Sequence, residues 1–272
     1  MDALHEKKAA LTARLRAYGR LLVAFSAGVD STFLLTAAQE ALGENVLAVS
    51  AQAPFVPARE QEEAVRFCQA RGIRHHLIRM NYEEIPNFTS NPPDRCYFCK
   101  KAIFSAFLEE ARRNEIPYVA EGSNLDDLGD YRPGLKAIQE LGIVSPLKEA
   151  GLGKADIRAL SREMGLPSWN KPSFACLASR FVYGESITQE KLQRIEQAED
   201  RLLSLGFTQF RVRLHGDMAR IELLPEEMTR LMDPALREEI RSFFHQLGFV
   251  YVTLDLDGFR SGSMNRTLKQ EP

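Results

Sequence analysis

The chain has 272 residues, of which 26% are charged, and its 35 basic side chains nearly balance its 37 acidic ones, for a formal net charge of −2. This length allows one large domain or two smaller ones, each able to bury a core without disulfides. The charge balance excludes an overall positive field of the kind that recruits nucleic acid or an anionic membrane. The N-terminus lacks the apolar core of a signal peptide and no apolar run is long enough to cross a bilayer, so we expect a cytoplasmic protein.

The first two thirds of the chain alternate short apolar runs with helical patterns. The predicted strands are residues 21–25, 46–50, 74–79 and 118–121, and the predicted helices between them are residues 31–42, 57–71 and 100–114. Strands that alternate with helices in this way predict right-handed crossovers and a mostly parallel sheet, which is an α/β fold. Ligands bind beyond the carboxyl ends of the strands in such sheets.

The last third of the chain changes character. After a helix over residues 155–164 and a loop with two prolines at 167–172, the pattern predicts elements at 188–205, 210–214, 219–224, 234–247 and 250–256. Their order, helix–strand–strand–helix–strand, is typical of a small α+β sandwich. We therefore divide the chain into an α/β domain at 1–175, a smaller α+β domain at 176–260 and a mobile polar tail at 261–272.

The turn after the first predicted strand contains the most informative residues of the chain. Residues 24–32 read Ala-Phe-Ser-Ala-Gly-Val-Asp-Ser-Thr, so that a buried strand ends, a small-residue turn follows and a helix begins. The N–H groups and the dipole at such a helix start favour phosphate. A turn that merely permits tight packing is the alternative reading. Polar crowding favours a binding site, and the crowded side chains are Ser26, Asp30, Ser31 and Thr32.

The cysteines form a second cluster of interest, and they are Cys68, Cys96, Cys99 and Cys176. A disulfide framework is not expected in a cytoplasmic chain. Cys68 lies in an apolar helical pattern, which predicts core packing. Cys96 and Cys99 form a C-x-x-C pair, with Cys176 as a third thiol. The spacing leaves three readings open: a zinc site with a non-cysteine fourth ligand, an iron–sulfur cluster held by three thiolates, or unrelated cysteines.

The loop at 26–31, Ser-Ala-Gly-Val-Asp-Ser, resembles the Ser-Gly-Gly-x-Asp-Ser signature of the PP-loop ATP pyrophosphatases, with Ala27 in place of a glycine. The resemblance implies an adenine nucleotide alpha hydrolase-like fold, the use of ATP and Mg²⁺, and adenylation of a substrate with release of pyrophosphate. The Gly-x-Asn-x-Asp-Asp pattern at 122–127 fits the same family, although an Asn/Asp-rich turn would also explain it. The ATP-binding residues implied in this way are Ser26, Gly28, Val29, Asp30, Ser31, Thr32, Ser50, Gly122 and Asp127.

Further segments narrow the resemblance to the LarE family, the sulfur transferases of nickel-pincer nucleotide biosynthesis, and they are residues 126–134, 170–181, 211–215 and 251–262. The family adenylates the carboxylates of pyridinium-3,5-biscarboxylic acid mononucleotide and converts them to thiocarboxylates. Some members sacrifice one cysteine as the sulfur source, whereas others use a 4Fe–4S cluster held by three cysteines. Here Ala175 stands at the sacrificial position, so the chain resembles the cluster type, with Cys96, Cys99 and Cys176 as catalytic residues and cluster ligands.

The resemblance also implies residues that bind the substrate. Arg211 and Arg213 share one face of a strand by their period of two and would grip the substrate phosphate, although a solvated strand face is the alternative. Arg180, close to Cys176, is a second anion-binding candidate. Glu199 resembles a metal-site glutamate of the family, although a surface helix residue is equally compatible with the sequence. A homo-oligomer, a hexamer by resemblance, is expected, and the sulfide donor is unknown.

Three rival functions remain open from the sequence. A tRNA thiolation enzyme would combine the same loop with a three-cysteine cluster, but such enzymes carry basic RNA-binding surfaces or extra zinc modules. An ammonia-using adenylating ligase would need no cysteines and would keep its activity without Cys176. A non-catalytic nucleotide-binding or zinc-stabilised scaffold would bind ATP without releasing pyrophosphate. The balanced charge disfavours the first rival, and the cysteines disfavour the second.

Overall fold

The computed structural model describes residues 3–129, 133–172, 174–260 and 262–263. The chain forms two compact units, and each is described by itself. Unit 1 comprises Met1–Ile85 and Cys96–Ser173, and unit 2 comprises Pro86–Arg95 and Phe174–Pro272. The sequence-based division leaves residues 86–95 in the first domain, whereas the structure assigns this segment to the second unit. Apart from residues 262 and 263, the predicted mobile tail lies outside the described residues.

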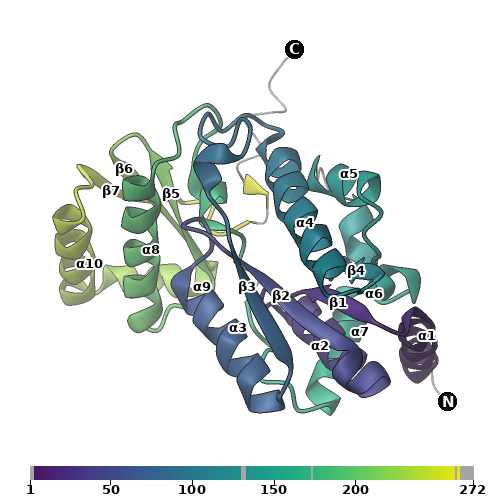
Figure 1. The fold of residues 1–272 in the computed structure, drawn as a ribbon. Helices are drawn as coiled ribbons and strands as arrows, with labels where there is room; N and C mark the ends of the chain where they lie inside the picture. Colours follow the sequence, from purple (N-terminus) through teal and green to yellow (C-terminus); the bar gives the residue numbers. More distant parts are fainter. Residues whose placement is uncertain (1–2, 130–132, 173, 261, 264–272) are drawn as a thin grey trace. The chain divides into compact units, whose positions relative to one another are not determined.

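Unit 1 is built around a four-stranded parallel sheet (Figure 1). In the sheet order β3-β2-β1-β4, the strands are Arg74–Arg79, Val46–Gln52, Leu21–Ala24 and Tyr118–Ala120. All four lie within one or two residues of the predicted strands. The parallel order places the ends of β1, β2 and β4 at one edge of the sheet, which is where ligands bind in open α/β folds.

Helices cover both faces of this sheet, and the residues of β1 alternate between them. Leu21 and Val23 pack with residues of helices α1, α2, α3 and α7, whereas Leu22 packs with residues of α4 and α5. Strands buried on both faces read as continuous apolar runs, which is why the strand signal was strong in the sequence. The helices of unit 1 are α1 (Ala3–Tyr18), α2 (Val29–Leu42), α3 (Ala58–Arg71), α4 (Arg95–Arg113, beginning at the last residue of a unit 2 segment), α5 (Pro133–Glu140), α6 (Pro146–Glu149) and α7 (Lys154–Glu163).

Unit 2 is the expected α+β arrangement, with a three-stranded sheet in the order β5-β6-β7. Strands β5 and β6 are antiparallel, and β7 runs parallel to β6. The elements of unit 2 are the 3₁₀ helix η4 (Leu177–Arg180), α8 (Gln189–Ser204), β5 (Phe210–His215), β6 (Met218–Leu223), α9 (Pro225–Met228), the 3₁₀ helix η5 (Thr229–Met232), α10 (Pro234–Gln246) and β7 (Tyr251–Leu254).

The segment at 86–95 belongs to unit 2 because its polar groups bond to the chain around η4. Asn91 donates from Nδ2 to the carbonyl oxygen of Val182 at 2.6 Å, and Arg95 donates from Nη1 to that of Ala178 at 2.8 Å. Both Asn91 and Arg95 are buried. No sequence pattern predicts such long-range bonds, so the sequence alone could not assign residues 86–95 to the second unit.

Helix α4 begins at Arg95, five residues before the predicted start at Lys100. Cys96 and Cys99 therefore lie in its first two turns rather than in the loop before it. Among the described residues, no helix combines the length and the hydropathy needed to cross a bilayer.

Candidate functional site

The loop after β1 forms an uncapped helix start. Gly28, the N-cap residue of α2, is extended, and no side chain caps the helix. The Oγ of Ser31 donates to the carbonyl oxygen of Gly28 at 3.2 Å, and the backbone nitrogen of Ser26 donates to the same Oγ at 3.3 Å. These bonds tie the loop into a compact turn and leave the first-turn N–H groups of α2 to a ligand, at the positive end of the helix dipole.

Ala27 adopts a left-handed conformation, with φ at 55°. The family signature has glycine here because glycine reaches this region without strain, whereas alanine costs roughly 1 kcal/mol. The Ala27 carbonyl accepts a hydrogen bond from Nζ of Lys171 at 3.0 Å. The alanine at the signature's glycine position thus adopts the left-handed conformation at the cost of backbone strain.

Ser50 and Thr32, both predicted to bind ATP, are largely enclosed. Ser50 donates from Oγ to the carbonyl oxygen of Phe25 at 2.6 Å, so the Nε2 of His75, at 2.8 Å, donates to the same hydroxyl. Burial, followed by the neighbouring His76, lowers the pKa of His75, which is consistent with a neutral ring. Thr32 is only 2% exposed. Its backbone N–H donates to the carbonyl oxygen of Gly28 at 2.9 Å, so Thr32 closes the first turn of α2, and its role in binding ATP stays a prediction.

The loop after β4 lies against the start of α2. Asn124 donates from Nδ2 to Oδ2 of Asp30 at 3.2 Å, and its backbone nitrogen donates to Oδ2 of Asp127 at 3.1 Å. Nζ of Lys154 lies 3.7 Å from Oδ1 of Asp127. The structure therefore brings together Asp30 and Asp127, which lie far apart in the sequence. Asn124 and Lys154 are site residues that the sequence analysis did not predict. Asn124 is part of the Gly-x-Asn pattern, whereas no local sequence pattern indicates Lys154.

The carboxyl of Asp30 has an unusual environment. Burial first, and the neighbouring Asp127 next, raise its pKa to about 6, against the lowering influence of Lys154, Asn124 and Arg158. Two carboxylates held this close are suited to a hard cation such as Mg²⁺. Within the described part of the chain, no group of three or more His, Cys, Asp or Glu side chains is arranged to hold a metal. The fit to Mg²⁺ therefore depends on these two oxygen donors together with ligands from a nucleotide.

Gly122 allows the β4 loop to approach the start of α2 closely. A Cβ at this position would lie 3.1 Å from the backbone nitrogen of Ser31 and 3.3 Å from the carbonyl carbon of Asp30. We expect Gly122→Ala to lower the free energy of unfolding by about 1–3 kcal/mol, because the two backbones must move apart. Urea unfolding would measure this change, and calorimetric titration with ATP would show weakened binding. Unchanged stability and affinity would contradict the role of this close approach.

A pocket of about 380 Å³ lies beside the β4 loop within unit 1. Ser123 and Asp127 line it on the loop side, and the apolar Leu135, Ile138 and Ile143 line much of the rest. Ser123 in turn donates to Oε2 of the buried Glu121. The remaining lining residues are Gln139, Ser145, Lys148 and Glu149, and such a mixture of apolar and polar groups is suited to an organic ligand that carries a charged group.

The three cysteines of interest are divided between the units. Cys96 and Cys99 lie three residues apart at the start of α4, a spacing that places both on one helix face. Cys176, the N-cap residue of η4, belongs to unit 2. Cys96 is exposed, whereas Cys99 and Cys176 are half-buried. Cys68, by contrast, is buried in the core as predicted, and burial raises the pKa of its thiol to about 12.

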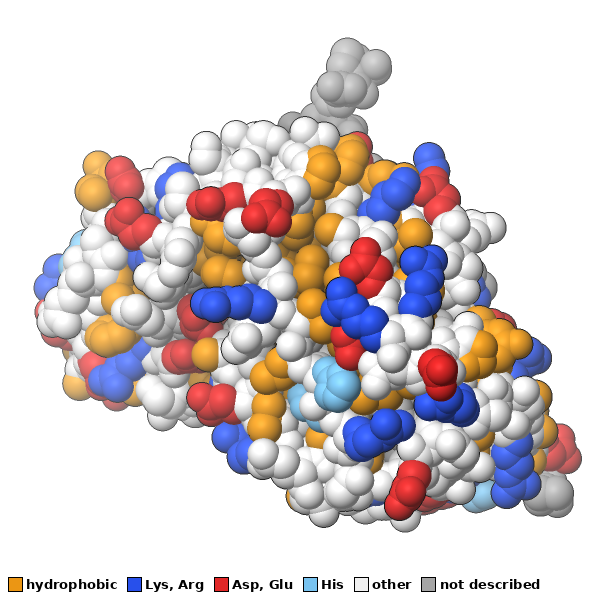
Figure 2. Space-filling view, viewed as in Figure 1, with side chains coloured by type: hydrophobic (Ala, Val, Ile, Leu, Met, Phe, Trp, Pro, Cys, Tyr) orange, Lys and Arg blue, Asp and Glu red, His pale blue; other side chains and the backbone are white. Residues whose placement is uncertain are grey.

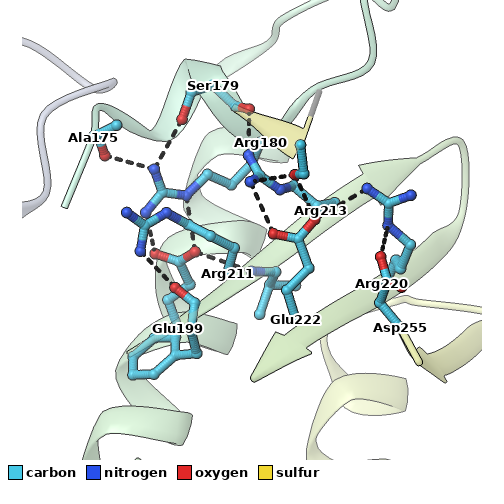
Figure 3. Close-up of polar contacts among 12 residues, drawn as sticks. Ala175, Ser179, Arg180, Glu199, Arg211, Arg213, Arg220, Glu222 and Asp255 are labelled. Carbon is cyan, nitrogen blue, oxygen red and sulfur yellow. Dashed lines mark hydrogen bonds and ion pairs between the residues drawn. The ribbon is translucent and has the colours of Figure 1, made fainter. Parts of the chain in front are cut away.

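Unit 2 contains a buried cluster of charged side chains (Figure 3). Arg180 and Glu199 form an ion pair, with Nη2 2.8 Å from Oε2 and both side chains 0% exposed. Nη1 of Arg180 also donates to the carbonyl oxygens of Ala175, at 2.6 Å, and Cys176, at 3.1 Å. The two residues that the sequence assigned to an anion site and a metal site thus satisfy each other. The metal role of Glu199 stays a prediction.

Arg211 and Arg213 lie on β5 and are both 5% exposed. The alternative of a solvated strand face is therefore wrong. Arg211 lies between the rings of Phe174 and Phe259, at 5.3 and 4.9 Å. Burial first, and the charge of Arg180 next, lower its pKa to about 9. Arg213 pairs with Glu222, at 2.9 Å.

The cluster is completed from β6, where Arg220 lies 3.1 Å from the second oxygen of Glu222 and 3.5 Å from Asp255. Four guanidinium groups therefore share three carboxylates (Figure 3). A cluster with more arginine than carboxylate side chains is suited to binding an anion.

The molecular surface shows a mixture of charges. On the face drawn in Figure 2, basic and acidic side chains alternate over short distances and are interspersed with apolar ones. This alternation agrees with the nearly balanced composition. Such a face does not focus a field of one sign toward a polyanion.

Comparison with known proteins identifies relatives along nearly the whole chain. The chain is 42% identical over 270 residues to the pyridinium-3,5-bisthiocarboxylic acid mononucleotide synthase of Lactiplantibacillus plantarum, which covers 98% of this chain and 97% of that protein. It is 45% identical over 249 residues to an uncharacterized protein of Synechocystis, covering 92% and 93%. A more distant relative is a subunit of the glutamine-hydrolysing GMP synthase of Thermoplasma acidophilum, 27% identical over 206 residues, or 68% and 65% of the two chains. No protein-family model matches the sequence.

Proposed function

Because this chain belongs to the LarE family of PP-loop enzymes, we propose that it is an ATP-dependent sulfurtransferase that makes thiocarboxylates in nickel-pincer nucleotide biosynthesis. The finer proposal is that it adenylates the carboxylates of pyridinium-3,5-biscarboxylic acid mononucleotide and then exchanges an oxygen of each for sulfur. One observation carries the proposal: the uncapped start of α2 lies beside the carboxyls of Asp30 and Asp127. That arrangement is suited to a nucleotide triphosphate and its cation.

The first step activates the substrate. The N–H groups at the start of α2 bind the phosphates of ATP, and Asp30 and Asp127 would hold Mg²⁺ against them. A carboxylate oxygen of the substrate attacks the α-phosphorus, the bond to the bridging oxygen breaks, and pyrophosphate leaves. The helix start and Lys154 stabilise the negative charge that develops during this step.

The second step delivers sulfur. A sulfide nucleophile, with inorganic sulfide as the simplest donor, attacks the acyl carbon of the adenylate. The carbon–sulfur bond forms, the bond to the AMP oxygen breaks, and AMP leaves with the electron pair while the proton of the sulfide passes to solvent. Two rounds of both steps convert the biscarboxylate to the bisthiocarboxylate.

The three cysteines are proposed to serve this second step. Cys96, Cys99 and Cys176 would hold a 4Fe–4S cluster, which when bound supplies an iron without a protein thiolate as a place for exchangeable sulfur. Thiolates are the usual ligands of such a cluster, the helical spacing of Cys96 and Cys99 suits a shared cluster, and neither thiol is buried. The proposal requires that all three thiolates reach one cluster.

The arginines of unit 2 are proposed to bind the substrate. Arg211 and Arg213 belong to the cluster of four arginines and three carboxylates, and their guanidinium groups would donate hydrogen bonds to the phosphate of a mononucleotide. The rings of Phe174 and Phe259 pack against the guanidinium of Arg211 and limit the orientations open to this planar group.

The test is a reaction of the anaerobically purified protein with ATP, Mg²⁺, sulfide and the biscarboxylate nucleotide. Mass spectrometry of the nucleotide product and assays of pyrophosphate and AMP would follow the two steps separately. We expect pyrophosphate release that depends on the biscarboxylate, together with a sulfur-for-oxygen mass change. Pyrophosphate release with ammonia as the incorporated nucleophile would instead favour an amide-forming ligase.

The raised pKa of Asp30 predicts a dependence on pH. The ordinary value is 3.8 and the folded value is about 6, so the folded state binds the proton more tightly and stability falls as the pH rises through this window. We expect Asp30→Asn to raise the free energy of unfolding at pH 7.5 by about 1–2 kcal/mol, since Asp30 retains partial solvent contact. The same variant should lose most pyrophosphate release, because the carboxylate that would hold Mg²⁺ is gone.

Urea unfolding at pH 7.5 and pH 5 would measure this effect on stability. The difference between variant and wild type should shrink at pH 5, where the wild-type carboxyl is largely protonated. In the wild type, the affinity for ATP with Mg²⁺ should fall as the pH drops below about 6, because the cation must then displace a proton. A variant that is less stable than the wild type at pH 7.5 would contradict the burial argument.

A further inference from the structure

We propose that Lys171 is a positioning residue of the phosphate loop, holding the peptide between Ala27 and Gly28 so that the Gly28 N–H faces the nucleotide. The inference rests on the proposed function, because it assigns Lys171 a role in the ATP site of that reaction. Nζ of Lys171 donates to the carbonyl oxygen of Ala27 at 3.0 Å and pairs with Oε2 of Glu63 at 2.6 Å. The lysine side chain is 17% exposed.

Lys171 is itself held from two other elements. Its backbone carbonyl accepts from Nη2 of Arg158 on α7 at 2.9 Å, and Nη1 of the same arginine donates to the carbonyl of Trp169 at 2.8 Å. Glu63, which fixes the ammonium group, lies on α3. The lysine thus approaches the loop from a segment anchored at its backbone and at its head, which limits the rotamers open to it.

The bond from Lys171 to the Ala27 carbonyl also fixes the direction of the Gly28 N–H, because both groups belong to one peptide plane. The described chain contains no cis peptide bond, and in a trans peptide the C=O and the next N–H point in opposite directions. With the Ala27 carbonyl held by Lys171, the N–H of Gly28 points away from the lysine. Gly28 is the N-cap of α2, so this N–H joins the donors of the helix start.

The strain at Ala27 explains why a holding contact is needed. An alanine at a φ of 55° relaxes toward negative φ unless the surroundings prevent it. A charge-assisted hydrogen bond to its carbonyl opposes that relaxation. In a loop with glycine at this position the left-handed conformation carries no strain, and the lysine would matter less.

The experiment is a double-mutant cycle with Lys171→Met and Ala27→Gly, with affinity for ATP in the presence of Mg²⁺ measured by calorimetry. In the wild-type background we expect Lys171→Met to weaken ATP binding by about tenfold, corresponding to loss of one charge-assisted bond. Ala27→Gly alone should stay within about twofold of wild type, because strain relief and added chain entropy oppose each other. In the Ala27→Gly background the effect of Lys171→Met should shrink to about threefold.

If Lys171 instead contacted the phosphate directly, Lys171→Met would weaken ATP binding equally in both backgrounds. That result would overturn the proposal. An unchanged affinity in Lys171→Met would overturn it as well. Lys171→Arg, which keeps a cationic donor, should retain most of the affinity. Exchange of labelled pyrophosphate into ATP should show Lys171→Met acting on the KM for ATP more than on kcat. Lys7→Met, which removes a lysine paired with Asp156 in the same unit, is the matched control and should bind ATP normally.

Two outcomes separate this inference from the proposed function. A wild-type protein that does not bind ATP would contradict the proposed function itself. A wild-type protein that binds ATP while Lys171→Met binds equally well would contradict only the role of Lys171. Should Lys171→Met not fold, Lys171→Gln replaces it in the cycle, because its shorter side chain cannot reach both Ala27 and Glu63 and the same two-background comparison then decides the outcome.

Discussion

Replacing Cys176 with alanine is expected to abolish thiocarboxylate formation while the adenylation step persists. Under the proposed mechanism the thiolate serves only sulfur delivery, and the ATP site consists of residues of unit 1. We expect product formation to fall by at least about 100-fold, whereas exchange of labelled pyrophosphate into ATP, measured with the biscarboxylate substrate, stays within about threefold of wild type. Iron and acid-labile sulfide in the anaerobically purified variant should fall with product formation, because a cluster ligand is missing.

The matched control is Cys68→Ala, which removes a thiol buried in the core of unit 1. It should retain product formation and iron content, with a loss of stability of about 1 kcal/mol from the small cavity. A Cys176→Ala protein that still makes thiocarboxylate would contradict the role of this thiol. Tightly bound zinc, with no iron after reconstitution, would contradict the cluster and favour the zinc reading of the three cysteines.

Replacing Arg180 with methionine is expected to cause the largest loss of stability of any variant considered. The change leaves Glu199 buried without its ion-pair partner, and an uncompensated buried charge costs about 3–5 kcal/mol. Burial alone would raise the pKa of Glu199, but Arg180 and the hydrogen bonds to this carboxylate outweigh burial and lower it. Without Arg180 the carboxyl is expected to take up a proton, so the loss should be smaller at pH 5 than at pH 7.5.

Urea unfolding of each variant would measure this effect. The double variant Arg180→Met/Glu199→Leu should recover much of the lost stability, because it removes both charges together. Arg201→Met, which breaks a half-exposed pair with Glu239, is the control and should cost less than about 1 kcal/mol. An Arg180→Met protein of normal stability but weakened substrate binding would instead assign Arg180 to the substrate site.

Much of unit 1 could be predicted from the sequence because its signals are local. Strands buried on both faces leave continuous apolar runs, and the turn at 26–32 joins one such run to a helix start. The match to the PP-loop signature rests on the same contiguous residues. Contiguous patterns of this kind survive without knowledge of the fold, because neighbouring residues stay neighbours in space.

Other features depend on residues that are distant along the chain. Lys171 bonds to the carbonyl of Ala27, 144 positions away, and to Glu63, 108 positions away. The sequence predicted an anion site for Arg180 and a metal site for Glu199, yet the two side chains form a buried ion pair with each other. Burial of a charged side chain is decided by what packs around it, and single-sequence patterns carry no information on that packing.

The sequence by itself determined the α/β class, and it predicted a nucleotide loop with its Ala27 departure and three cysteines for sulfur chemistry. Those conclusions depend on short sequence segments in which the residue types alone indicate the chemistry. Only the tertiary structure decided that Asp30 faces Asp127, that Lys171 holds the strained loop, and that the arginines of unit 2 are buried among carboxylates. Each of these pairings is set by how separate elements pack, because the free energy of a charge depends on its surroundings rather than on its neighbours in sequence.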